Sequence, residues 1–171
     1  MRFLIIFVFI INIFASEYKL GHGVKLSEYL RVGSYISTKY KASKKSDEIG
    51  LDDIAILGYG NLTPKFSYLL ELEATTFYTK NLDTRESDFN THFHIERAYF
   101  DYKFSDYLKF RVRKFITPIG YWNLVPINVL RDTTSSPLYG YRIFPKFTTG
   151  VKLYGFLNDD IEYNLFIQLD I

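Results

Sequence analysis

The sequence predicts an all-β chain that forms part of an antiparallel transmembrane β-barrel. Three observations predict this fold. After the N-terminus the chain reads as about seven segments in which polar and apolar side chains alternate. The connections between these segments alternate between short and long. Hydrophobic residues make up 47% of the 171 residues and charged residues 23%, so the two kinds are closely interleaved, as two-faced strands require.

The first 16 residues predict a secretory signal peptide. Met1 and Arg2 precede an apolar stretch over residues 3–14, and Ala15 and Ser16 follow it. At about 12 residues this stretch is shorter than the roughly 20 that a membrane-spanning helix needs. We therefore expect export, with residues 1–16 as signal peptide and 17–171 as the N-terminal portion of the barrel.

The first three predicted strands cover residues 28–40, 52–60 and 65–79. The third shows the pattern best, because Leu70 and Leu72 share one face while Glu71 and Glu73 share the other. A helix would mix these two sets.

The last four predicted strands cover residues 93–104, 108–116, 146–156 and 161–171. The segment 161–171 has the most regular alternation. Lipid offers a backbone no hydrogen-bond partner, so spanning strands must form a closed barrel with polar side chains toward a water-filled lumen. The charged side chains expected to line this lumen are Arg31, Glu71, Glu73, Arg97, Asp101, Lys109, Arg111 and Arg113.

Loop lengths support the same fold. The connections at residues 61–64, 105–107 and 157–160 are short, whereas those at 41–51, 80–92 and 117–145 are long. Outer-membrane barrels combine tight periplasmic turns with long outer loops.

Two stretches resemble a known family. Residues 96–102, Glu-Arg-Ala-Tyr-Phe-Asp-Tyr, and 112–120, Val-Arg-Lys-Phe-Ile-Thr-Pro-Ile-Gly, resemble the phosphate-selective porin O and P family and related Gram-negative outer-membrane porins. Arg113 stands where that family usually has Gly, and Ile119 where it has an aromatic residue.

The resemblance implies that residues 118–145 fold into the pore as a constriction loop. It also implies about 16 strands in the complete barrel and a homotrimer at full length. The charged and aromatic residues that would narrow the pore are Tyr121, Trp122, Arg131, Asp132, Tyr139 and Arg142.

Solute selectivity does not follow from the sequence. Arg31, Lys109, Arg111 and Arg113 could attract anions, but Glu71, Glu73 and Asp101 are expected to face the same lumen. The net charge of +2 gives no reason to expect a nucleic-acid partner.

Neither a cofactor nor a metal is expected. His92, His94 and Glu96 alternate along one strand, but three ligands in line cannot easily surround an ion. The chain has no Cys, and Ser and His show no catalytic spacing, so we do not expect an enzyme.

We therefore expect an outer-membrane porin in contact with lipid, through which small hydrophilic solutes or anions diffuse passively. A non-conducting structural or adhesive barrel and a soluble secreted β-protein are the alternatives. An odd strand count leaves a barrel open, so the sequence also suggests a truncated or fragmentary porin.

Overall fold

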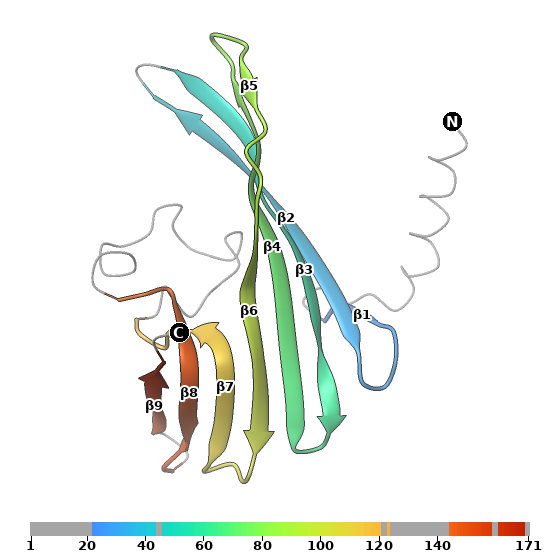
Figure 1. Cartoon of the computed structure of the whole chain (residues 1–171), viewed down its shortest axis with the longest axis vertical. Helices are drawn as coiled ribbons and strands as arrows, with labels where there is room; N and C mark the ends of the chain where they lie inside the picture. Colours follow the sequence, from blue (N-terminus) through green and yellow to red (C-terminus); the bar gives the residue numbers. More distant parts are fainter. Residues whose placement is uncertain (1–21, 44–45, 121–122, 124–143, 159–160, 170–171) are drawn as a thin grey trace.

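The computed structural model describes residues 22–43, 46–120, 123, 144–158 and 161–169, which form one antiparallel sheet (Figure 1). The strands are β1 (Val24–Lys25), β2 (Arg31–Ala42), β3 (Asp47–Thr63), β4 (Phe66–Asn81), β5 (Ser87–Asp88), β6 (His92–Lys103), β7 (Lys109–Ile116), β8 (Phe147–Phe156) and β9 (Glu162–Gln168). Their order is β1-β2-β3-β4-β6-β7-β8-β9, with β5 paired to β4. The all-β antiparallel prediction is confirmed, and the described sheet is open, with β1 and β9 at its ends.

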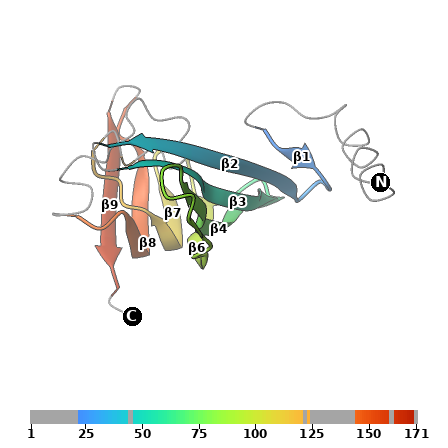
Figure 2. The same ribbon diagram turned by 90° about the horizontal axis from the view of Figure 1, so that it is seen from above.

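Each of the seven predicted segments corresponds to one of the seven longer strands. The added strands β1 and β5 have two residues each. Figure 2, from above, shows a strong twist between β2 and β9. No helix among the described residues has the length and apolar character needed to span a bilayer.

The predicted long loop at residues 41–51 is wrong. Strands β2 and β3 stay paired to Ala42 and Asp47, so their hairpin extends well beyond the ends of β7 to β9 (Figure 1). The polar composition of residues 41–51 suggested a loop, but contacts between polar side chains support paired strands there. Tyr40 donates to Asp47 at 2.8 Å, and Lys39 pairs with Asp52 at 2.5 Å.

The short turns lie at the opposite end of the sheet and share one hydrogen-bonding pattern. In each turn a side-chain oxygen accepts a hydrogen bond from the backbone N–H three residues later: Thr63 from Phe66, Ser105 from Leu108 and Asn158 from Ile161. Lys103 also donates to Asp106, and this hydrogen bond lowers the pKa of the Asp106 carboxyl.

Burial is the reverse of that in a soluble domain. Among the described residues only Ala55, Ala74 and Phe115 are buried hydrophobic side chains, whereas nine buried residues are polar or charged. Soluble proteins bury Leu, Ile, Val and Phe and keep Glu and Lys in water. Here the charged groups of one face are covered instead.

The opposite face carries exposed apolar side chains on each of the longer strands from β3 to β9, which we call the apolar belt. Cross-strand register joins its members from β3 to β6 and again from β6 to β9. The belt consists of Ile56, Leu72, Ile95, Phe100, Val112, Val151 and Ile167. A row across so many strands exceeds the scattered exposure that is normal on soluble proteins.

A β-bulge interrupts the alternation in β6. Glu71 pairs with Arg97 while the next residue, Leu72, pairs with Ile95, so Glu96 is the additional residue. Strict alternation would place His94 and Arg97 on opposite faces. The bulge puts both beside the carboxylates of β4.

Gly60 is required where residues 26–30 turn back against β3. A Cβ atom at Gly60 would lie 1.9 Å from the Tyr29 carbonyl oxygen, whereas at Gly33 the nearest atom would lie 3.9 Å away. Tyr29 is also held by Tyr68, whose hydroxyl donates to the same carbonyl at 2.9 Å.

We expect Gly60→Ala to lower the free energy of unfolding by about 1–3 kcal/mol, because a methyl group there must displace backbone. Gly33→Ala is the matched control, with an expected change below about 1 kcal/mol. Urea titration followed by far-ultraviolet circular dichroism measures both. Equal midpoints for the two variants would contradict the close approach.

Candidate functional site: the charged inner face of the sheet

The register places the eight predicted lumen residues on one face of the sheet. Arg31 pairs with Tyr59, Tyr59 with Leu69, Leu69 with Tyr99 and Tyr99 with Arg113, so these side chains share a face. The remaining six, Glu71, Glu73, Arg97, Asp101, Lys109 and Arg111, follow from the same pairing. We call this side the inner face.

Two carboxylates form the centre of the inner face. Glu71 is 0% exposed and Glu73 is 6% exposed, although they stand two residues apart on β4. Arg97 donates from Nε to Glu71 Oε2. The Tyr35 hydroxyl lies between the two carboxylates, 3.2 Å from Glu71 Oε1 and 3.0 Å from Glu73 Oε1.

His94 links this pair to a third carboxylate. Its Nε2 lies 3.2 Å from Glu73 Oε2 and 3.0 Å from Glu96 Oε2. Lys146 donates to the other oxygen of Glu96 at 2.6 Å. A continuous chain of contacts therefore runs from Arg97 on β6 to Lys146, just before β8.

Lys146 also belongs to the base of the longest connection in the chain. Its carbonyl accepts from the Thr117 N–H at 3.0 Å, and the Thr117 and Thr148 hydroxyls are 2.8 Å apart. The Asn123 amide donates to the Thr117 carbonyl at 2.6 Å and to that of Lys146 at 3.2 Å. Both ends of the connection are thus fastened to each other.

The expected constriction residues lie outside the described residues. This applies to all six of them, Tyr121, Trp122, Arg131, Asp132, Tyr139 and Arg142. Residues 118–120, 123 and 144–145 are the described part of the expected loop. The constriction loop stays a prediction.

A second cluster of charged side chains lies on the inner face nearer the short turns. Arg111 forms two hydrogen bonds of 2.7 Å to Asp101, and its guanidinium lies 3.8 Å from the centre of the Tyr99 ring. On the next strand Lys152 donates to Asn164 at 3.2 Å. Its ammonium lies 4.4 Å from the centre of the Tyr154 ring.

Acids and bases of the inner face differ in their pairing. Each of Glu71, Glu73, Glu96 and Asp101 contacts Arg, His or Lys. Within the described part of the chain, Lys109, Arg113 and Lys152 have no carboxylate within ion-pair distance. These three cations of the inner face therefore lie outside its ion pairs.

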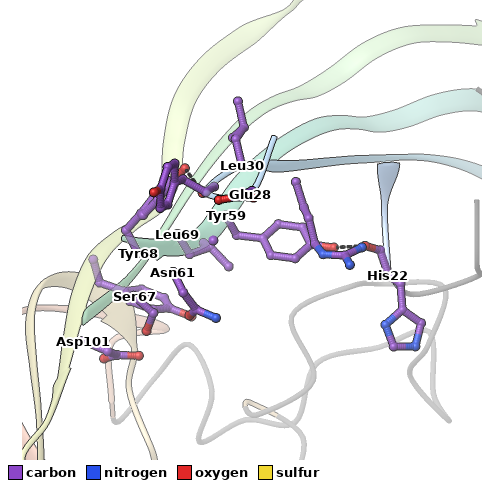
Figure 3. A pocket seen from close by; sticks show the side chains of 13 residues that line it. His22, Glu28, Leu30, Tyr59, Asn61, Ser67, Tyr68, Leu69 and Asp101 are labelled. Carbon is purple, nitrogen blue, oxygen red and sulfur yellow. Dashed lines mark hydrogen bonds between the residues drawn. The ribbon is translucent and has the colours of Figure 1, made fainter. Parts of the chain in front are cut away.

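A hollow of about 440 Å³ opens at the turn end of the inner face (Figure 3). Tyr59 and Arg31 close one side of it, because both donate to the His22 carbonyl, at 2.5 and 3.3 Å. Ser67 and Asp101 lie toward the other side. Polar groups from β2, β3, β4 and β6 thus line one water-accessible space.

Sequence reasoning missed Lys146, Lys152 and the joint role of His94 and Glu96. Lys146 and Lys152 share a face because their spacing is even, and reading residues 146–156 with a period of two could have found them. The Glu96 bulge has no comparable sequence signal. His92, which was grouped with His94 and Glu96, is exposed and pairs with Thr75.

Arg113 occupies a backbone conformation that favours glycine. Its φ angle is 89°, and it lies in the regular part of β7 opposite Gly150. Side chains with a Cβ atom avoid this region because of steric contact with the backbone. This strained residue lies four positions before Thr117, which belongs to the base of the long connection.

No family model matches this sequence, and no curated protein matches it either. The resemblance carried by residues 96–102 and 112–120 therefore stays a prediction.

We expect Arg113→Gly to unfold with a free energy about 1 kcal/mol higher than Arg113→Ala, because both remove the guanidinium and only glycine relieves the positive φ. Urea unfolding of the two variants measures the difference. An alanine variant as stable as the glycine variant would show that position 113 is not strained.

Proposed function

We propose that this chain forms part of the wall of an outer-membrane β-barrel through which small hydrophilic solutes diffuse, with a preference for anions. The observation that carries the proposal is the reversed burial: one face exposes the apolar belt, and the other covers paired charges. A bilayer accepts apolar side chains outside a barrel, and a water-filled lumen accepts polar ones inside.

In water the apolar belt would be costly. Each square ångström of apolar surface removed from water contributes about 25 cal/mol, so lipid contact stabilises a face that a soluble protein would need to cover. Paired strands also satisfy their backbone groups, which lipid cannot do. The open edges at β1 and β9 need further strands in the membrane, from this chain or from other copies. A barrel of about 16 strands and a trimer belong to the proposal.

The anion preference follows from the pairing on the inner face. Glu71, Glu96 and Asp101 are each paired with Arg97, Lys146 or Arg111, and Glu73 contacts His94. Lys109 and Arg113 keep an uncompensated charge toward the lumen, which raises the local anion concentration. The proposal does not extend to phosphate specificity.

A non-conducting adhesive barrel is the second candidate. The β2–β3 hairpin, which extends far beyond β7 to β9, favours it because a projecting hairpin offers a surface to a partner (Figure 1). Conductance separates the two candidates. Reconstitution of the purified chain into planar bilayers should give discrete conductance steps if it forms a channel, and none if it is only adhesive.

The apolar belt can be tested with Ile56→Lys, which places a charge where the proposal puts lipid. We expect the free energy of unfolding in lipid vesicles to fall by about 2 kcal/mol. Gln168→Lys, on the exposed inner face of β9, is the control and should change it by less than about 0.5 kcal/mol. Two equally small changes would indicate that Ile56 faces water.

The anion preference can be tested with Lys109→Gln. Removing one uncompensated lumen charge should shift the zero-current potential in a salt gradient toward cation selectivity, without abolishing conductance. Lys41→Gln removes the same charge in the outer hairpin, where Lys41 faces Glu48 at 3.8 Å, and should leave the potential unchanged. Equal shifts for both variants would contradict a local effect of Lys109.

A further inference from the structure

The inner face holds a three-residue cluster that channel conduction does not require. We propose that Glu73, His94 and Glu96 bind a divalent transition-metal ion of the Zn²⁺ class, with lumen water completing the coordination. The three offer one imidazole nitrogen and two carboxylate oxygens, all within 4.8 Å of one another. His92, His94 and Glu96 follow one another in line on one strand, and three ligands in line cannot easily surround an ion. Here Glu73 on β4 takes the place of His92.

The ligand spacing agrees with a tetrahedral ion. With bonds of about 2.1 Å, tetrahedral ligands lie about 3.4 Å apart. His94 Nε2 is 3.2 Å from Glu73 Oε2 and 3.0 Å from Glu96 Oε2. Small side-chain movements therefore admit the ion without movement of the strands.

Hydrogen bonds from neighbouring residues orient the carboxylates of Glu73 and Glu96 toward His94. Tyr35 holds Glu73 through Oε1, and Lys146 holds Glu96 through Oε1. Each therefore presents its Oε2 to the same imidazole nitrogen. Outer contacts of this kind orient the ligands of protein metal sites and reduce the ordering needed on binding.

Charge, donor type and access favour a divalent transition metal. Two carboxylates balance the charge of the ion, and the imidazole selects Zn²⁺ and its neighbours over Mg²⁺ or Ca²⁺, which prefer oxygen alone. The ligands differ in exposure: the His94 side chain is 37% exposed, while Glu73 and Glu96 are at most 6% exposed. An ion can therefore enter from the lumen and still bind largely buried oxygens.

The site would couple the ion to the long connection. Glu96 is shared between His94 and Lys146, and Lys146 supplies the carbonyl that fastens Thr117 and Asn123. A bound ion withdraws electron density from Glu96 and so weakens its hold on Lys146. Binding of the ion would thus weaken a contact of Lys146, which is part of the base of the connection.

The proposal can be tested by isothermal titration calorimetry. The refolded full chain in detergent micelles is titrated with Zn²⁺ at neutral pH. We expect one ion per chain with a micromolar dissociation constant. Glu73→Gln and His94→Ala should each weaken binding by more than about tenfold. His92→Ala is the control, because His92 lies on the same strand outside the cluster, and its affinity should stay within about twofold of the unchanged chain.

A second measurement needs no variant. Co²⁺ in a tetrahedral nitrogen and oxygen site gives strong visible absorption, which Zn²⁺ should displace. Absence of saturable Zn²⁺ binding below millimolar concentration, or equal loss in His92→Ala and His94→Ala, would overturn the proposal. The titration requires only the folded sheet, so its outcome is independent of bilayer conductance.

Discussion

Two buried carboxylates set the main constraint on this structure. Glu71 and Glu73 point to the same side of β4 and are almost removed from solvent. A buried carboxylate is costly without a hydrogen-bonded partner, so their neighbours must supply compensation. Tyr35 supplies it from β2, and Arg97 and His94 supply it from β6. Because 94 and 97 differ by an odd number, only a bulge lets both side chains reach β4, and Glu96 provides it.

The bulge separates two functions of the same strand. On one side it brings charged groups to the inner face, and on the other Ile95 and Phe100 remain in the apolar belt. Without the additional residue, one of the two faces would lose its pattern, because a shift by one residue moves every following side chain across the sheet. Strand β9 alternates regularly without a bulge. Its Asn164 accepts a hydrogen bond from Lys152 on the neighbouring strand β8.

How much the sequence predicted follows from this distinction. A period of two gave the seven longer strands and the shared face of Glu71, Arg97, Asp101 and Arg111, because the period is a local property of each segment. The contact of Glu73 with His94 could not be obtained in this way, since it depends on register between strands and on the bulge. The extended β2–β3 hairpin was missed because its residues are polar, and pairs such as Tyr40 with Asp47 replace apolar packing there.

The same network connects the rigid sheet to its longest connection. Phe115 and Thr117 are fully covered at the end of β7, and Thr117 contacts Thr148 across the start of β8. Lys146 lies between this base and Glu96. Its backbone carbonyl accepts from Thr117, its ammonium donates to Glu96 on β6, and His94 links Glu96 to Glu73 on β4. Because the Lys146 ammonium is 2.6 Å from Glu96, a change in charge at Glu96 acts directly on Lys146. The hydrogen-bonded base at Thr117, Asn123 and Lys146 is therefore the part of the connection that a change of charge on the inner face reaches most directly.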